Sequence, residues 1–593
     1  MITVSEPMAP PRWALLERHL IDSIAEACRV FYDRYFDEQG YLECVPRWGG
    51  LDGADDAAEN VAAFPDLYAL GGPRDVYDLF RQGIEGHIRQ YTEAKTTVTE
   101  LGRDGMYYKE YPTCFDPLHN GEGYHCLFQQ GLCEPWDPVY RKRMKRFAGF
   151  YLPGDPDEPP EPNYDPEHRI IRSTMTGSRG PLLRTATAAD WCGDPFETPA
   201  RFHPGRGHRD YDDYVIHYEQ HYPDVVGDGP MNLALNVWAL HAYMLDGESK
   251  YRDWLLEYAD GWLERTRAND NIVPANVGLD GTLGGSYGGR WWRGVFGWAH
   301  TCERPYFRHN CAFPDRVTYG WANALYLTGD RAYVEVWRDV IDAVNSHARQ
   351  DRGLTLYPRM RGDDGWYAFE PTPWNRGALE LFYWTLDPRD RERVSDHPWI
   401  AFLDGGNPEF PVQRLEWALA TVRERIARVR ADTSTRDTRL SEDPNGLNPA
   451  EMVWPLVQLM LGGLPSRHIG VPWHTRVRYF DPERGRSGIP EQVASLVTGF
   501  APGEDGADTV EVTLVNLDTV RPRTLVLQAG AYGESRIRSV TAGGTRTPVD
   551  DRATVVHLRP GAGAQLTLAI ERYVEQPTLA FPAAASASPP GLG

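Results

Sequence analysis

The stretch WALLERHLIDSIAEACRVFYDRYF, residues 13–36, shows most clearly the pattern from which the fold class is predicted. Its apolar residues recur three and four positions apart, which places them on one face of an α-helix. The same spacing recurs in about a dozen segments up to residue 465, separated by long loops rich in Gly, Pro, Asp and aromatic residues. The sequence therefore predicts a mainly α-helical domain over residues 1–470.

One motif repeats where helices end. LDGESKY (245–251) and LTGDRAY (327–333) share it, and LGGPRDVY (70–77) is a looser copy. Glycine readily takes the left-handed conformation that ends a helix, and the acidic residue after it favours the start of the next helix. The motif is found in any bundle of helical hairpins and is also compatible with an ancestral repeat. In either case it predicts helical hairpins joined by tight turns.

The pattern changes to period two after about residue 474. Five short runs alternate in this way: TRVRYF (475–480), VEVTLVNL (510–517), TLVLQA (524–529), ATVVHL (553–558) and AQLTLAI (564–570). Alternating runs separated by Gly- and Asp-rich turns are typical of a small antiparallel β-sandwich, here over residues 471–575. The Ala-, Ser- and Pro-rich end, 576–593, is predicted to be disordered.

The composition excludes several classes of partner. Among 593 residues, 84 are acidic and 62 are basic, so the net charge is −22. This charge disfavours binding to nucleic acid or to an anionic membrane. The chain has no long apolar run, its first twenty residues show no basic segment followed by an apolar run, and its eight cysteines form no CxxC pair. We expect a cytoplasmic protein with reduced thiols and with no membrane or nucleic-acid partner.

Two loop carboxyl groups are the candidates for hydrolytic chemistry. Glycoside hydrolysis needs one carboxylic acid that donates a proton and one carboxylate that activates water or attacks carbon. Glu122 lies between two glycines in HNGEGYH (119–125), and Asp228 lies between two glycines ahead of an apolar helix. These positions predict Glu122 and Asp228 as the catalytic pair. Asp55 and Asp56, in contrast, look like caps in the first turn of a helix.

The residue types for β-elimination of a uronate are present as well. That reaction needs a base beside the sugar carboxylate and a group that neutralises the developing enolate. His119 or His309 is the candidate neutralising group, and Tyr124 or Tyr306 is the candidate base. Each of these side chains has the alternative of a purely structural or sugar-binding role.

A basic, aromatic segment favours an acidic sugar. RWWRGVFGWAHTCERPYFRHNCAFPDR (290–316) contains five arginines and only two acidic residues. Arginine matches a carboxylate with its planar fork, and tryptophan stacks on sugar rings. The alternative is that these arginines pair with the acidic surplus elsewhere. The residues expected to hold the sugar are Trp48, Asp52, Asn120, His125, Arg290, Trp292, Arg304 and Arg308.

Metal and nucleotide chemistry are not expected. The pairs His300/Cys302, His309/Cys311 and His217/His221 have metal-ligand side chains, but not the spacing of a usual zinc site. The Gly-rich turn GGSYGG (284–289) neither follows a predicted strand nor opens a helix, so it is no phosphate loop. We expect neither a metal nor a cofactor.

These features together resemble the six-hairpin glycosidase superfamily over residues 13–570. The stretch RWGGLDGADDAAEN (47–60), with Trp48 and Asp52, looks like the aromatic and acidic cleft loops of such enzymes, and the Leu-x-Gly turns look like their hairpin ends. The resemblance implies an (α/α)6 toroid followed by the β-sandwich. It also implies a carbohydrate-active enzyme, without identifying the bond that is cleaved.

The expected function is hydrolysis of an oligosaccharide by carboxylic acid and base catalysis. We expect cleavage from the chain end and a uronic acid in the substrate. The alternatives are a lyase that eliminates the same kind of sugar and a protein that binds glycans without turning them over. The sequence leaves the sugar, the linkage and the oligomeric state open.

Overall fold

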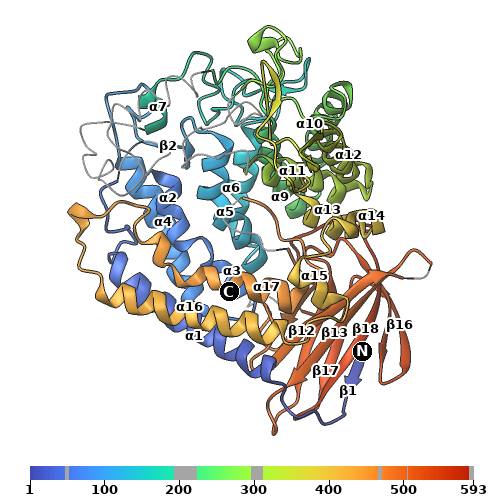
Figure 1. Cartoon of the computed structure of the whole chain (residues 1–593). Helices are drawn as coiled ribbons and strands as arrows, with labels where there is room; N and C mark the ends of the chain where they lie inside the picture. The colour runs from blue at the N-terminus through green and yellow to red at the C-terminus, as the bar shows by residue number, and fades with distance from the viewer. Residues whose placement is uncertain are drawn as a thin grey trace.

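The computed structural model describes residues 1–46, 48, 53–192, 224–294, 312–464, 470–503 and 505–585 (Figure 1). Within these ranges the chain is mainly helical up to residue 461 and forms a separate sheet region from residue 477 onward. This order agrees with the predicted helical domain followed by a β domain.

The described helices fall into two groups along the chain. The first group is α1 (Arg12–Tyr35), α2 (Ala54–Ala62), α3 (Phe64–Ala69), α4 (Arg74–Glu93), α5 (Pro117–Cys133), α6 (Pro138–Gly149) and α7 (Ala188–Cys192). The second is the 3-10 helix η2 (Pro230–Asn236), α9 (Val237–Asp246), α10 (Ser249–Ala268), α11 (Ala312–Thr328), α12 (Ala332–Ser346), α13 (Ala378–Thr385), α14 (Pro388–Glu392), α15 (Pro398–Leu403), α16 (Phe410–Ala431), the 3-10 helix η7 (Pro449–Val453) and α17 (Trp454–Leu461).

Helices that follow each other in sequence pack together, and so do helices far apart. α3 contacts α4, α5 contacts α6, α9 contacts α10, and α11 contacts both α10 and α12. Across longer separations, α2 packs along α5, and η2 packs between α5 and α11. Helix α1 lies along α16, so the first and the last long helix are neighbours (Figure 1).

The predicted glycine turns between helices are confirmed. Gly247 caps the end of α9 with a φ of 72°, and Gly329 follows α11 with a φ of 71°. Both lie in the left-handed region that glycine adopts without steric cost. In the looser copy, the left-handed residue is Gly71, with a φ of 112°.

Short two-stranded hairpins lie in the loops between helices. They pair β2 (Tyr107–Tyr108) with β3 (Tyr111–Pro112), β4 (Tyr164–Asp165) with β5 (Ile170–Ile171), β6 (Arg349–Asp351) with β7 (Leu354–Leu356) and β8 (Met360–Gly362) with β9 (Gly365–Tyr367).

Two five-stranded sheets form the β region. The first has the order β1 (Ile2–Val4), β17 (Ala553–Leu558), β14 (Arg523–Ala529), β10 (Val477–Asp481) and β11 (Arg486–Ser487). The second has the order β12 (Val493–Pro502), β13 (Asp508–Asn516), β18 (Gly563–Glu571), β15 (Arg536–Ala542) and β16 (Thr545–Asp551). The five predicted runs fall on β10, β13, β14, β17 and β18. Alternate residues of both sheets are buried in one common core, as in a sandwich.

Three expectations for this region need correction. The strand β12 was not predicted from the sequence. Helices α15, α17 and α1 pack on it, so its residues are buried on both faces and do not alternate between apolar and polar. The helical domain does not begin at residue 1, since β1 pairs in parallel with β17. Residues 576–585 are ordered: Thr578 N donates to Tyr532 O at 2.9 Å, and Leu579 N donates to Met244 O at 3.1 Å.

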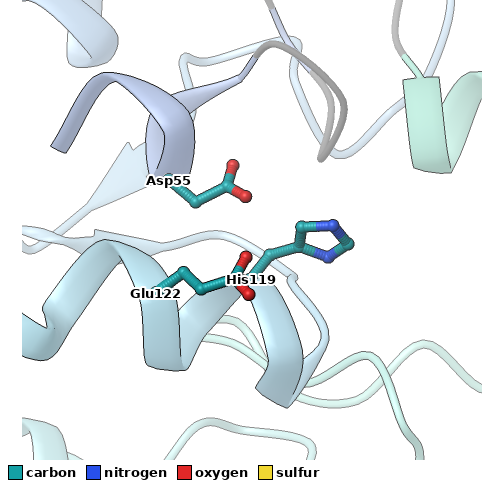
Figure 2. A group of neighbouring side chains, drawn as sticks. All are labelled: Asp55, His119 and Glu122. Atoms are coloured by element: carbon teal, nitrogen blue, oxygen red, sulfur yellow. The ribbon is translucent and has the colours of Figure 1, made fainter. Parts of the chain in front are cut away.

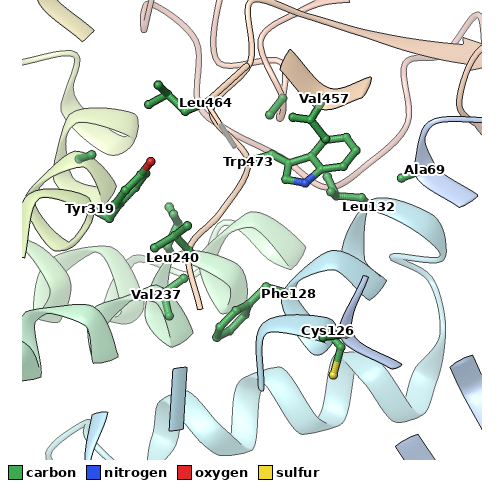
Figure 3. Packing of buried hydrophobic residues seen from close by; sticks show 14 of the residues in the cluster. Ala69, Cys126, Phe128, Leu132, Val237, Leu240, Tyr319, Val457, Leu464 and Trp473 are labelled. Carbon is green, nitrogen blue, oxygen red and sulfur yellow. The ribbon is translucent and has the colours of Figure 1, made fainter. Parts of the chain in front are cut away.

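One hydrophobic core runs through the helices and into the sheets. Trp473, in the segment between α17 and β10, packs near Val457 and Leu132, with Phe128 and Leu240 below it (Figure 3). Because its ring is fully buried, the indole nitrogen needs an acceptor, and it donates to Asp66 Oδ1 at 2.9 Å. Within the described residues, no helix has the length and apolarity needed to cross a lipid bilayer.

Glu17 connects helix α1 to an edge of the second sheet. Its side chain is 1% exposed, and its Oε1 accepts a hydrogen bond from the backbone nitrogen of Ser495 in β12 at 3.1 Å. β12 is the outer strand of its sheet, so this contact covers an edge that would otherwise be open. Burial raises the pKa of Glu17 to about 8, although the Ser495 hydrogen bond and the charge of Arg18 act in the opposite direction.

We expect Glu17→Gln to stabilise the protein increasingly as the pH rises from about 4.5 to about 8. In the unfolded chain Glu17 ionises at its ordinary pKa, whereas the folded protein holds the proton to higher pH, so the wild type loses stability across this interval. The difference in free energy of unfolding is absent below the lower pKa and reaches about 2–4 kcal/mol at about pH 9. Urea titrations across this pH range measure it. Glu26→Gln, exposed on the same helix, is the control, and an equal gain at every pH would contradict the prediction.

Candidate functional site

Three side chains from two helix starts meet in the helical domain. Asp55 lies in the first turn of α2, and His119 and Glu122 lie three residues apart on α5. Figure 2 shows Asp55 facing the two α5 residues. One oxygen or nitrogen from each of the three lies within 4.8 Å of the others. We call Asp55, His119 and Glu122 the α2–α5 cluster.

The local sequence explains why the two helices approach so closely. Asp116 caps α5, because its Oδ1 accepts hydrogen bonds from Leu118 N at 3.0 Å and His119 N at 3.3 Å. Gly123 faces α2, and a Cβ at this position would lie 3.2 Å from the Cα of Asp55. A larger residue at 123 would therefore push the two helices apart.

Glu122 is held by a cation from a third helix. Arg316 of α11 donates from Nη2 to Glu122 Oε1 at 3.1 Å and also reaches Leu118 O at 3.4 Å. The Glu122 side chain is 25% exposed, whereas the arginine is buried. Burial raises the pKa of Glu122, and the charges of Arg316 and His119 limit that rise.

Asp55 has no such partner. Its residue is 2% exposed, and neither carboxyl oxygen has a hydrogen-bond partner. Burial raises the pKa of Asp55 well above its usual range, and the negative charges of Asp56, Glu122 and other nearby acids add to the rise. A buried carboxyl group without a donor is costly, so this position is built for something other than stability.

His119 is oriented by the residue that caps its own helix. Its Nδ1 forms a hydrogen bond with Asp116 Oδ2, which leaves Nε2 as the nitrogen that can bind another group. Burial alone would lower the pKa of His119, but the charge and hydrogen bond of Asp116, with the charges of Glu122 and Asp56, raise it to about 9. Protonated His119 is therefore a cation beside the two cluster carboxyl groups at neutral pH.

A narrow pocket opens beside the cluster and has room for about one water molecule or small ion. Its aromatic walls are Trp48, Tyr107, Phe115 and Tyr124, and its polar lining is Asp55, His119 and Asn120. The Asn120 Oδ1 and the Trp48 Nε1 are buried and lack hydrogen-bond partners. The pocket thus combines ring faces with unsatisfied polar atoms.

The structure brings several predicted residues together. Glu122 and His119 belong to the cluster, and Trp48, Asn120 and Tyr124 line the pocket. Tyr124 is not poised as a base, because it is buried and its hydroxyl donates to Glu110 O at 3.1 Å. His125 does not line the pocket, and its Nε2 lies 3.9 Å from Asp66 Oδ2 in the core.

Asp228, the predicted partner of Glu122, does not belong to the α2–α5 cluster, and its carboxylate accepts hydrogen bonds from neighbouring elements. Asp228 is 1% exposed, and the donors to its carboxylate lie on three elements. These donors are Ile171 N at 3.1 Å, Asn232 Nδ2 at 2.8 Å, Tyr258 Oη at 3.0 Å and Trp262 Nε1 at 3.2 Å. Burial raises the pKa of Asp228 to about 7, although these hydrogen bonds and Arg265 oppose the rise.

Within the described part of the basic segment, Arg290, Trp292 and Arg293 contact one carboxylate, that of Asp363. Arg293 donates to Asp363 Oδ2 at 2.5 Å, and Trp292 donates from Nε1 to Asp363 Oδ1 at 2.8 Å. Arg290 contacts the same carboxylate at 3.9 Å. Several residues considered in the sequence analysis lie outside the described residues: Asp52, Arg304, Tyr306, Arg308, His309, Cys311, His217, His221, His300 and Cys302.

Sequence reasoning missed Asp55, Asp116 and Arg316 as site residues. Asp55 and Asp116 are helix-start acids, which capping alone accounts for. Arg316 stands at the end of the basic segment, about 190 residues from its partner Glu122. The available signal was the acid-rich stretch RWGGLDGADDAAEN (47–60) itself, in which Asp55 lies.

Comparison with known families adds one match. A family model described as "Domain of unknown function (DUF8034)" matches residues 1–397, about two thirds of the chain. The match spans the helices that carry the α2–α5 cluster and Arg316. A search of curated proteins found no match.

Proposed function

Because this chain belongs to the DUF8034 family, whose description names no activity, we propose a function from the site itself: hydrolysis of a glycosidic bond. The observation that carries the proposal is the convergence of two carboxyl groups from different helices with unlike partners. Glycoside hydrolysis needs such a pair, one to donate a proton and one to activate water or attack the anomeric carbon.

The contacts of the two groups support a division of roles. Arg316 stabilises the ionised form of Glu122, so we assign water activation or nucleophilic attack to Glu122. Neither oxygen of Asp55 accepts a hydrogen bond, so Asp55 is assigned proton donation. His119, Asn120 and the aromatic Trp48 line the narrow pocket beside this pair.

The arrangement of helices supports an (α/α)6 toroid as the scaffold. Five pairs of helices in contact fit this arrangement: α1 with α3, α6 with α9, α10 with α11, α12 with α13, and α16 with η7–α17. The sixth hairpin would be α4 with α5, which follow each other in the chain. Contact between α1 and α16 would close the ring. In this arrangement α2, α5 and α11 are inner helices, and all three contribute to the site near their N-terminal ends.

The charge balance around the site favours a neutral sugar at the cleaved bond. The carboxyl groups that interact there are Asp55, Asp56, Glu59, Asp116 and Glu122. Within the described residues, the cations beside them are His119 and Arg316, and Arg316 already pairs with Glu122. A uronate would have to be recognised by arginines such as Arg304 and Arg308, outside the described residues.

The test is incubation of the full chain with a panel of neutral and uronate-containing oligosaccharides, followed by product analysis. Hydrolysis creates a new reducing end and incorporates one water oxygen, which mass spectrometry detects in ¹⁸O-labelled water. An unsaturated product without added water would identify a lyase instead. Binding without turnover by any oligosaccharide of the panel would identify a glycan-binding protein.

A further inference from the structure

The α2–α5 cluster combines side chains that bind divalent transition metals. A carboxylate, an imidazole and a second carboxylate are a common ligand set for zinc and manganese in proteins. Here they come from Asp55, His119 and Glu122, whose nearest ligand atoms all lie within 4.8 Å of one another (Figure 2). Small side-chain rotations would bring such atoms onto a shared ion.

Two buried acceptors point independently to a ligand. Both oxygens of Asp55 lack a hydrogen-bond donor although the residue is 98% buried, and one of them lies within 4.8 Å of ligand atoms of His119 and Glu122. The Asn120 Oδ1 is also buried and unpartnered, and it lines the same pocket as Asp55 and His119. Unsatisfied buried acceptors are costly, and a bound cation would satisfy them together.

The surroundings of His119 match those of a metal ligand. Metal-binding histidines usually donate their other ring nitrogen to a carboxylate, which fixes the ring and makes the ligand nitrogen more basic. Asp116 takes this position at Nδ1 of His119 and is itself held by the start of α5. Arg316 contacts Oε1 of Glu122, so Oε2 remains as the ligand oxygen.

We propose that Asp55, His119 and Glu122 bind one divalent transition-metal ion, such as Zn²⁺ or Mn²⁺, with the Asn120 amide oxygen as a further ligand. The regulatory consequence rests on the proposed function: a cation that occupies both carboxyl groups leaves neither available for proton transfer. The metal-bound and the hydrolytic states of the site then exclude each other, and added metal inhibits hydrolysis.

Calorimetric titration of chelator-treated full-length protein with ZnCl₂ and with MnCl₂, in the absence of glycan, tests the site. We expect one ion per chain for at least one of the two metals. Asp55→Asn and His119→Gln each remove a proposed ligand, so each should weaken binding by more than the about 10–100-fold that loss of an outer-shell partner typically costs. His168→Gln is the matched control. His168 Nδ1 pairs with Asp165 Oδ2 at 2.7 Å in the same Asp-x-x-His spacing, but at a more exposed position.

Unchanged affinity in both cluster variants, or no binding of either ion by the wild type, would overturn the proposal. Thermal unfolding of each variant shows that it is folded. The visible spectrum of bound Co²⁺, compared between wild type and His119→Gln, gives a second measure of ligation that needs no substrate. Metal binding without glycan hydrolysis would support the metal site and reject the proposed hydrolase function. Hydrolysis without metal binding would support the hydrolase function and reject the metal site.

Discussion

Replacement of Asp55 by asparagine is expected to reduce the rate of glycan hydrolysis by about 10²–10⁴-fold, the effect of removing a general acid or base. Asparagine has nearly the same shape, so α2 and the pocket wall should keep their structure. It cannot donate a proton from a carboxyl group or take up a negative charge. Rates under saturating substrate, measured with the substrate identified by the oligosaccharide panel, check this prediction.

The stability of the same variant provides a second readout. Asp55 is a buried carboxyl group without a hydrogen-bond partner, and a neutral amide costs less to bury than a charge. The variant should therefore unfold at the same or a higher temperature while it loses activity. Asp75→Asn is the matched control: Asp75 also occupies the second position of a helix, α4, but is exposed and paired with Arg29 at 2.5 Å. Equal activity of the two variants would remove Asp55 from the mechanism.

Replacement of Asp228 by alanine is expected to lower the free energy of unfolding by about 3–5 kcal/mol, because it leaves several buried donors unpaired. The donors include the backbone nitrogen of Ile171 and the side chains of Tyr258 and Trp262, which join β5 to α10 through this one carboxylate. Urea unfolding of wild type and variant, followed by tryptophan fluorescence, measures the difference.

The Asp228 result separates a structural from a catalytic role. Asp253→Ala is the control, since Asp253 lies on α10 and its side chain is 62% exposed. We expect Asp228→Ala to be much less stable than Asp253→Ala, with any loss of activity following the loss of folded protein. A variant that unfolds like the wild type but has lost turnover would restore Asp228 as a catalytic candidate.

The two carboxyl groups differ in a way that their local sequences do not show. Asp55 and Asp228 both precede or open a helix, and both are almost fully buried. Asp228 is surrounded by donors that complete its hydrogen bonding, whereas Asp55 faces another carboxyl group and a histidine. Only the surroundings of Asp228 lower the energy of the folded protein, so those of Asp55 are the ones that indicate function.

Features that depend on near neighbours along the chain could be predicted from the amino-acid sequence. Apolar spacing predicted helices such as α1 and α4, the left-handed glycines at 247 and 329 ended α9 and α11, and period-two runs predicted β10, β13, β14, β17 and β18. Each depends on local backbone preference and on one buried face, and both can be read from a short window of residues.

Contacts between distant residues could not be predicted in this way, because they depend on how the whole chain folds. β12 lacks the period-two pattern because helices cover its second face, and β1 pairs with a strand, β17, more than 550 residues away. Likewise, the candidate site unites residue 55 with residues 119, 122 and 316, while Asp228 finds its partners elsewhere. A carboxyl group in a first helical turn has the same local sequence pattern whether it caps the helix, stabilises the core or takes part in a reaction. Its role follows from the charges and donors that folding brings to it from distant parts of the chain.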